Sequence, residues 1–435
     1  MASLVGNAIN ASCGGLLKTD DNAIIGATEK RVTDGLGNAS NMTIGTGGTS
    51  FDSGTVDFTG ATVSGLPSAA GLESGTGTDS MQSAASLTTV AANAVGTCSI
   101  ALGSNASTLA GGSNAIAIGK DVTGSAFNNN TIGIGDTIGT SGRRTIAIGC
   151  SISTTQDDSI SIGNVITDTG ACSIAIGAES VSSNTNTVSI GHCATASGAS
   201  SLALGPGATA SANGAIAVSA QSSGSSAQAT GACAIAVGQR MVNSGACAVA
   251  IGYRADTAST HAISIGALAG GNAACAIAIG SAANANGIDS IAIGNTVTAT
   301  GQEDVLIGKG AAAEASNKGG TALGAGTCVD DGAVALGRTS KATGIHSIAI
   351  GGNCNLFGGA SATAGGTRSI AIGNGAISNT TGAVALGTQV TAAKAETVTV
   401  KELETCIAGG GITMKSPNGT EYKLTVSDAG ALVIT

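Results

Sequence analysis

Large aromatic side chains are almost absent from this 435-residue chain, which has no tryptophan, two tyrosines and four phenylalanines. A thick globular core normally takes much of its buried area from such rings. Alanine, isoleucine, valine and leucine supply most of the apolar content instead. The composition therefore argues against an ordinary globular core and favours a thin, layered one.

Charge is also scarce, because charged residues make up only 10% of the chain and the formal net charge is −9. An acidic chain repels phosphate backbones, and a basic spot such as Arg143-Arg144 is a pair rather than a cluster. We therefore expect no nucleic acid among its partners. The apolar fraction of 42% is nevertheless too high for a disordered chain. With 70 glycines, such a protein must depend on regular backbone hydrogen bonding.

Long apolar runs are missing as well. No stretch approaches the roughly 18 apolar residues of a membrane-spanning helix, so we expect no membrane insertion. The first basic residue is Lys18 and no apolar segment follows Met1, so no secretion signal of the Sec type is expected. These features predict assembly in a cytoplasm.

A short apolar strand that closes on glycine recurs from Cys98 to Gly387, as in Ser173-Ile-Ala-Ile-Gly177. The dominant spacing is 14 residues, with a few steps of 13 or 16 and two longer steps of 19 and 22. Alternation of large and small residues predicts a β-strand. A second glycine often lies seven residues before the first, as Gly170 does, and predicts a turn. One unit is therefore strand, turn, strand, turn.

A single 14-residue coil does not stand alone, because ordering each backbone residue costs about 1–2 kcal/mol. Coils must stack so that each strand pairs with its equivalents above and below. A bare column would leave an apolar strip exposed, and three columns packed about an axis would bury it. Small alanine and serine at the alternate positions would permit close approach. The sequence predicts an all-β, parallel β-solenoid. The expected repeat core is Ile146, Ile148, Gly149, Ile174, Ile176, Gly177, Leu202, Leu204, Gly205, Ile277, Ile279, Gly280, Ile291, Ile293 and Gly294.

Eleven cysteines and three histidines raise the question of a metal or disulfide site. The cysteine count is odd and no C-x-x-C pair occurs, so neither is expected, and no cofactor is predicted. The histidines are expected on the surface. Five cysteines fall five residues before the repeat glycine and are expected to be small buried fillers. They are Cys98, Cys172, Cys233, Cys247 and Cys275.

The Ser-Ile-Ala-Ile-Gly strand at a 14-residue period resembles the YadA-like head repeat of trimeric autotransporter adhesins, which also occurs in phage fibres. The resemblance implies a left-handed parallel β-roll with three chains to a head, hence a homotrimer. Autotransporters also carry a secretion signal, a coiled-coil stalk and a membrane β-barrel anchor, and none is recognised here. The segment Lys415–Tyr422 instead resembles the ending of some phage virion proteins. Residues Gly75–Ser83 resemble a segment of marine cyanophage structural proteins.

Three regions are predicted on this basis. Residues 1–97 form an N-terminal attachment region and a Ser/Thr/Gly-rich linker. Residues 98–391 form the YadA-like solenoid. Residues 392–435 form a small all-β cap with a hairpin, which covers the last open coil.

No catalytic constellation is recognised, so we expect no enzyme. Asp157-Asp158 is expected to be solvated at a turn, and no Gly-x-Ser-x-Gly elbow is present. The longer steps at Gln221–Gln228 and Gly352–Gly366 insert loops on the lateral face. Phe357, in the second loop, is either a surface contact or tucked under its own loop.

The leading hypothesis is a virion structural fibre, in the head, neck or tail, that binds other virion proteins through its N-terminal region. Its role would be contact with a host-surface receptor or glycan. A bacterial cell-surface adhesin is the alternative, with an extracellular location. An ice- or crystal-binding solenoid would need a regular Thr-x-Thr array, and threonine is irregular in the second strand. An embedded depolymerase is disfavoured, because no carboxylate recurs in a groove-like pattern.

Overall fold

The computed structural model divides into two compact units, Met1–Pro67 and Ser68–Thr435. In the described residues the protein is all-β with no helix, and therefore with no helix that could span a membrane. The structure describes the four strands between residues 18 and 51, and then residues 72–83, 91–108, 113–123, 130–220, 226–313, 318–353, 360–401, 412–426 and 431–434.

The first unit contains a four-stranded antiparallel sheet in the order β1-β2-β3-β4. Its strands are β1 (Lys18–Thr19), β2 (Lys30–Thr33), β3 (Ala39–Gly45) and β4 (Gly48–Phe51). This sheet lies within the region predicted to be an attachment region and linker, whose role stays a prediction.

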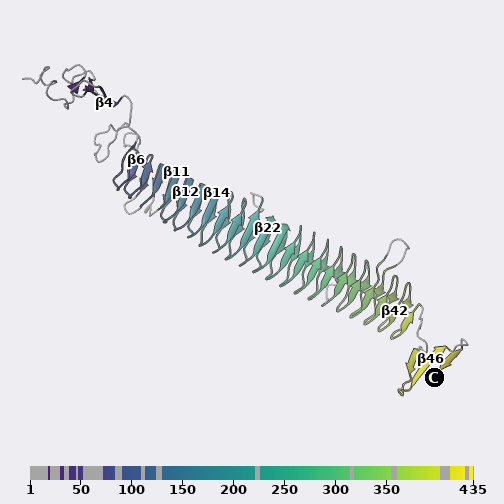
Figure 1. Cartoon of the computed structure of the whole chain (residues 1–435). Coiled ribbons are helices and arrows are strands. Elements are labelled where there is room, and N and C mark those ends of the chain that lie inside the picture. The colour runs from purple at the N-terminus through teal and green to yellow at the C-terminus, as the bar shows by residue number, and fades with distance from the viewer. Residues whose placement is uncertain are drawn as a thin grey trace, which may run out of the picture. The chain divides into compact units, whose positions relative to one another are not determined.

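The second unit is dominated by a parallel β-solenoid of about twenty coils, which Figure 1 shows as a regular stack of strands. An antiparallel pair, β5 (Leu72–Ser74) and β6 (Met81–Ser83), precedes it, and β6 pairs in parallel with the first repeat strand. Each coil contributes to two faces. The first face consists of β8 (Ile100–Leu102), β10 (Ile116–Thr123), β11 (Ile132–Thr140), β12 (Ile146–Thr154), β13 (Ile160–Asp168), β14 (Ile174–Ala178), β16 (Val188–Ile190), β18 (Leu202–Leu204), β20 (Ile216–Ser219), β22 (Ile235–Gln239), β24 (Val249–Tyr253), β26 (Ile263–Ile265), β28 (Ile277–Ile279), β30 (Ile291–Ile293), β32 (Val305–Ile307), β34 (Thr321–Leu323), β36 (Val334–Leu336), β38 (Ile348–Ile350), β40 (Ile370–Ile372), β42 (Val384–Leu386) and β44 (Val398–Val400).

The second face has shorter strands, and β10 to β13 are long enough to serve both faces. Its separate strands are β7 (Asn93–Ala94), β9 (Ser107–Thr108), β15 (Val181–Ser182), β17 (Thr195–Ala196), β19 (Thr209–Ala210), β21 (Ala227–Ala229), β23 (Met241–Asn243), β25 (Asp256–Thr257), β27 (Gly270–Gly271), β29 (Asn284–Ala285), β31 (Thr298–Ala299), β33 (Ala312–Ala313), β35 (Cys328–Val329), β37 (Lys341–Ala342), β39 (Thr363–Ala364), β41 (Ile377–Ser378) and β43 (Thr391–Ala392).

Strands pair with their equivalents one repeat away. Ile146 of β12 pairs with Ile160 of β13, which pairs with Ile174 of β14. The closing glycines pair in the same register, as Gly149 does with Gly163. The predicted parallel solenoid, with coils of about 14 residues and aligned glycine rungs, is confirmed.

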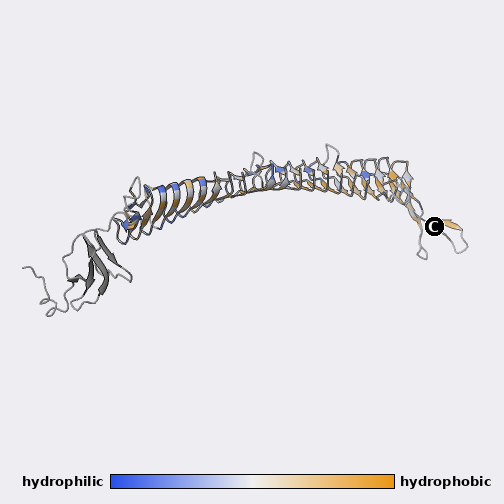
Figure 2. Ribbon diagram, turned by 90° about the horizontal axis from the view of Figure 1, so that it is seen from above, coloured by the Kyte–Doolittle hydropathy of each residue, from blue (hydrophilic) through white to orange (hydrophobic). Residues whose placement is uncertain are grey.

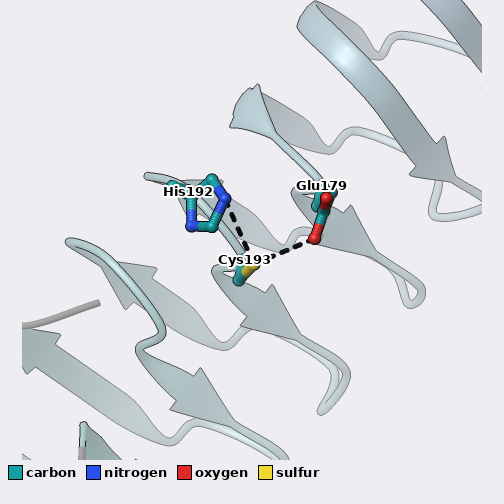
Figure 3. A group of neighbouring side chains, drawn as sticks. All are labelled: Glu179, His192 and Cys193. Carbon is teal, nitrogen blue, oxygen red and sulfur yellow. Dashed lines mark hydrogen bonds between the residues drawn. The ribbon is translucent and has the colours of Figure 1, made fainter. Parts of the chain in front are cut away.

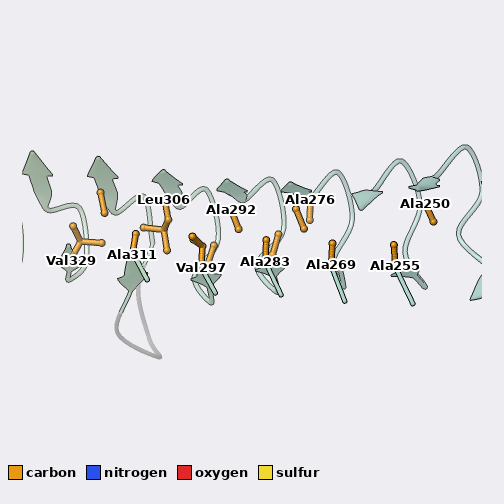
Figure 4. Packing of buried hydrophobic residues seen from close by; sticks show 14 of the residues in the cluster. Ala250, Ala255, Ala269, Ala276, Ala283, Ala292, Val297, Leu306, Ala311 and Val329 are labelled. Atoms are coloured by element: carbon orange, nitrogen blue, oxygen red, sulfur yellow. The ribbon is translucent and has the colours of Figure 1, made fainter. Parts of the chain in front are cut away.

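The interior of each coil is filled by small side chains. The alanine between the two large aliphatics is 0% exposed, as at Ala147, Ala175 and Ala278. Figure 4 shows such residues from the two faces pointing toward each other across the narrow coil. Larger side chains occur at some rungs, where Ile138 and Ile152 stack or Leu306 replaces an alanine. Each face usually directs two small side chains into the coil, as Ala215 and Ala217 do on the first face and Ala208 and Ala210 on the second.

The expected repeat core is therefore placed differently from the prediction. The aliphatics Ile146, Ile148, Ile174, Ile176, Leu202, Leu204, Ile277, Ile279, Ile291 and Ile293 all lie on the outer side of the first face, and most of them are half-buried. The physical reason is width, because alternation in a strand sends only one set of side chains inward, and at these rungs the narrow interior is filled by the small set. The alanines expected at a close approach between columns are the interior of a single column.

Residues at the two turns of a coil frequently have the left-handed backbone conformation. Cys172 and Cys233 have φ values of 55° and 54°, and His261 occupies the equivalent position with φ of 58°. All five repeat cysteines are exposed. The expectation that they are buried fillers is wrong, because the left-handed turn directs their side chains away from the coil. The three histidines are exposed, as expected.

The C-terminal residues form a three-stranded antiparallel sheet of β45 (Ile412–Lys415), β46 (Glu421–Val426) and β47 (Leu432–Ile434). An ion pair of 2.7 Å joins Lys415 Nζ to Glu421 Oε1 across the hairpin. The predicted hairpin is thus present. Its role as a cap on the solenoid stays a prediction.

The glycine at the end of each first strand gives a testable prediction. A Cβ added at Gly149 would lie 1.7 Å from the carbonyl oxygen of Gly163, and φ is +142°. We expect Gly149→Ala to destabilise the solenoid by at least about 1–3 kcal/mol, seen as a lower apparent Tm in circular dichroism. Gly139→Ala is the matched control, since its nearest contact is 3.9 Å away. Equal Tm losses in the two variants would contradict the role given to the close backbone approach.

Candidate functional site

The outer side of the first face carries two parallel rows of apolar side chains. One row is three residues before the repeat glycine and the other is one residue before it, as at Ile277 and Ile279. In the described strands from β8 to β44 these positions hold isoleucine, leucine or valine, except for Thr321. We call these two rows the aliphatic stripe. Apolar residues recur from coil to coil along the solenoid in Figure 2.

The stripe remains accessible in the single chain. Leu204, Leu336 and Ile372 are 39%, 44% and 39% exposed, and most other stripe residues are half-buried. Strands about 4.8 Å apart over about twenty coils give a stripe roughly 95 Å long. Soluble monomers rarely expose a continuous apolar patch of more than a few hundred Å². The stripe is therefore a packing surface that the described residues of one chain leave partly exposed.

The turns carry polar side chains that meet between neighbouring coils. Arg143 and Arg144 form ion pairs of 2.9 and 2.5 Å with Asp157 and Asp158, each 14 residues further on. The hydrogen bonds from Arg143 lower the pKa of Asp157, and that from Arg144 lowers the pKa of Asp158. Asp158 is exposed and Asp157 is partly exposed, but both are ion-paired rather than simply solvated as expected. Such pairs favour one register, while their exposure limits their effect on stability.

Two carboxylates lie inside the coil instead. Asp168 accepts hydrogen bonds from Ser161 Oγ, Ser173 Oγ and the backbone N–H of Gly170. Asp304 accepts from the backbone N–H groups of Gly301 and Gly320 at 2.8 and 2.9 Å. Burial raises the pKa of both carboxyl groups, against the opposing effect of these donors. These hydrogen bonds to neighbouring coil residues give both carboxylates a structural role.

One group of metal-ligand side chains was not recognised in the sequence. Glu179, His192 and Cys193 come together at a turn, with their ligand atoms all within 4.8 Å of one another. The Cys193 thiol donates to Glu179 Oε2 at 3.1 Å, and Cys193 Sγ lies 3.6 Å from His192 Nε2 (Figure 3). The signal was available, because residues 179 and 193 are one repeat apart. Aligning the repeats as stacked rungs would have placed them side by side.

Phe357 lies outside the described residues, as do 221–225 and 354–359 of the two inserted loops. Its assignment as a surface contact stays a prediction.

The parallel coils, the glycine rungs and the aliphatic stripe define a β-solenoid repeat protein. A family model described as the YadA head domain repeat matches residues 169–192, 196–218, 276–296, 331–353 and 359–389. The solenoid therefore contains YadA head domain repeats, and the resemblance drawn from the Ser-Ile-Ala-Ile-Gly strand is confirmed. These matches fall within the expected repeat region of 98–391. No curated protein matches the chain.

The buried carboxyl of Asp168 predicts a pH dependence of stability. Its folded pKa lies above the unfolded value of about 3.9, so its charged form is disfavoured in the fold. The contribution of Asp168 to the free energy of unfolding is fully present below the unfolded pKa of about 3.9, and it is lost as the pH rises through the folded pKa. Asp168→Ser introduces the residue found at the equivalent position 182. We expect the Tm of the variant, relative to the natural protein, to increase from pH 3.5 to pH 7.

Thr154→Ser is the control for this experiment, because position 154 is the equivalent interior position one coil earlier and carries no ionisable group. Its Tm difference from the natural protein should stay constant over the same pH range. A constant difference for Asp168→Ser as well would remove the pH dependence assigned to Asp168.

Proposed function

We propose that this protein is a homotrimeric fibre in which the aliphatic stripes of three solenoids pack together about a common axis. The single observation that carries the proposal is the stripe itself, which is continuous apart from Thr321 and which the described residues of one chain leave partly exposed. The interior of the coil is already filled, mostly by alanine, so the stripe side chains cannot be buried in the core of their own coil. Fully burying an aliphatic side chain stabilises by about 1.5–3 kcal/mol, and the stripe residues are half-buried. Association would thus add about 1–3 kcal/mol per coil.

The count of three comes from the YadA head repeats, since heads of that type have three chains. Repeats of adhesin heads favour a protein displayed on a surface, with a structural or adhesive role rather than a catalytic one. Self-association and surface contact are then its two tasks. The aliphatic stripe would mediate self-association. The exposed turns and the second face would then contact other surfaces.

A virion appendage is the particular fibre that we favour. The β45–β46 hairpin carries the segment that resembles the ending of phage virion proteins. The separate N-terminal unit suits attachment to other virion proteins. The solenoid predicted at residues 98–391, which continues to β44, would project, and the residues after β44 would cap it. The finer assignments, to a virion and to host-receptor contact, depend on these resemblances. A bacterial cell-surface adhesin with the same solenoid is the alternative.

An ice- or crystal-binding role is disfavoured by the second face. Its outward residue in successive coils is Thr209, Gln228, Val242, Asp256 and Gly270. A flat array of one residue type, which a lattice-matching surface requires, is missing from this part of the described solenoid. Variation from coil to coil fits a surface that contacts an irregular partner.

The proposed trimer is tested by placing charge in the stripe. Ile277→Lys combined with Ile279→Lys should split or weaken the trimer, because two ammonium groups per chain would be buried at the axis. The mass measured by light scattering should fall from three times the 40.8 kDa chain mass toward one chain. Ile288→Lys is the control, since Ile288 is 51% exposed at a turn. A natural protein that is monomeric would overturn the proposal.

The location of the fibre is tested separately. An antibody against the hairpin of residues 412–426 should label purified phage particles, and mass spectrometry of those particles should detect the chain. Labelling of intact cells in a culture free of phage would instead establish the adhesin alternative. Either result leaves the trimer test unaffected, because it depends on the solenoid alone.

A further inference from the structure

The turn that holds Glu179, His192 and Cys193 stacks two coils directly on each other. Glu179 and Cys193 occupy equivalent positions, each two residues after a repeat glycine, with φ of 56° and 55°. Parallel pairing of β15 and β17, through Val181 and Thr195, fixes the two coils in register. Side chains that leave the backbone at equivalent points of adjacent coils lie side by side. His192 precedes Cys193 and reaches the same spot from the same coil.

We propose that Glu179, His192 and Cys193 form a binding site for one Zn²⁺ ion on the outer surface of each solenoid, with water as the fourth ligand. Thiolate, imidazole and carboxylate are all ligands of zinc, and three protein ligands with one open position form a recognised coordination pattern. The mixture of sulfur and nitrogen donors favours zinc over calcium or magnesium, which take oxygen ligands.

The distance between the sulfur and nitrogen ligand atoms fits a tetrahedral ion. With Zn–S of about 2.3 Å and Zn–N of about 2.0–2.1 Å, a tetrahedral ion holds the sulfur and nitrogen roughly 3.6 Å apart. Cys193 Sγ and His192 Nε2 lie 3.6 Å apart. The separation between Cys193 Sγ and Glu179 Oε2 is 3.1 Å, about half an ångström shorter than a tetrahedral ion requires. A small rotation of the exposed Glu179 side chain opens that gap.

The backbone holds the ligands in place before the ion arrives. The N–H of Glu179 donates to Asn164 O and that of Cys193 donates to Ala178 O, both at 2.8 Å. The next coil has Gly207 at the position equivalent to Cys193, with φ of 67°. Since glycine has no side chain, the next rung leaves room for the fourth ligand. The turn therefore holds the backbone of the ligand residues in place, and the side of the site next to Gly207 is open to solvent.

Binding exchanges a proton for the metal. The hydrogen bond to Glu179 raises the pKa of the Cys193 thiol. The reaction is Cys193–SH plus Zn²⁺ giving Cys193–S–Zn⁺ plus H⁺, with no change in oxidation state. Zinc affinity should consequently rise with pH. Among the described residues, no other group of three His, Cys, Asp or Glu side chains brings its ligand atoms this close.

Cobalt(II) is a suitable probe, because a tetrahedral Co²⁺–thiolate site absorbs in the near ultraviolet and the visible. The full chain, freed of metal and kept reduced, should bind one strong equivalent of Co²⁺ per chain, and Zn²⁺ should displace it. Cys193→Ser should remove the thiolate-to-cobalt absorption. His192→Ala should weaken Co²⁺ binding at least tenfold, and Glu179→Gln should weaken it as well.

Two control variants separate this site from the remaining thiols and imidazoles. Cys172→Ser and His261→Ala change exposed turn residues elsewhere on the solenoid and should leave the cobalt spectrum and affinity unchanged. Circular dichroism checks that each variant keeps its β-structure. A cobalt spectrum that survives Cys193→Ser, an affinity unaffected by His192→Ala, or the absence of a strong thiolate site in the natural protein would each overturn the proposal.

Discussion

Backbone hydrogen bonding between residues one repeat apart is the interaction on which the rest of this structure depends. Each strand of the first face bonds to its equivalents in the coils before and after it, as β12 does with β11 and β13. At the strand ends the backbones of neighbouring coils approach closely, and a Cβ at Gly149 would lie 1.7 Å from the carbonyl oxygen of Gly163. A coil that lost this approach would tilt away from its neighbours, and every side-chain column would lose its alignment.

Strict stacking then determines what each residue type does. Inside, the coil is so narrow that alanine is the common filler, with a larger residue such as Leu306 only at particular rungs. Outside, the same strand presents isoleucine, and stacking turns two residues per coil into a stripe that runs along the solenoid. Apolar burial is therefore divided between a core that one chain completes and a surface that needs further chains.

The sequence predicts the period, the parallel stacking and the glycine rungs, because all three follow from spacing. Which side chains of each strand point into the coil could not be predicted from spacing. An Ile-Ala-Ile strand alternates equally well in either orientation, and only the width of the closed coil sends Ala147 inward and Ile146 outward. The exposure of the repeat cysteines could not be predicted for a similar reason, since spacing does not reveal that Cys172 has a left-handed backbone conformation. The strand pattern thus predicts that equivalent side chains stack in rows. Whether a row lies inside or outside the coil depends on how the coil closes in three dimensions.

The turns show how such a scaffold acquires local chemistry without any change of fold. Side chains at equivalent turn positions meet whatever their type, because the backbone beneath them is held by the rungs. Arg144 meets Asp158 in one pair of coils, and Glu179 meets Cys193 in another. Each meeting needs only one residue in each of two consecutive repeats, whereas a change at a glycine rung or an interior alanine disturbs the stack. Conservation of the interior and variation at the turns is accordingly the pattern that this architecture permits, and contact sites should be sought among the turns and the outward positions of the second face.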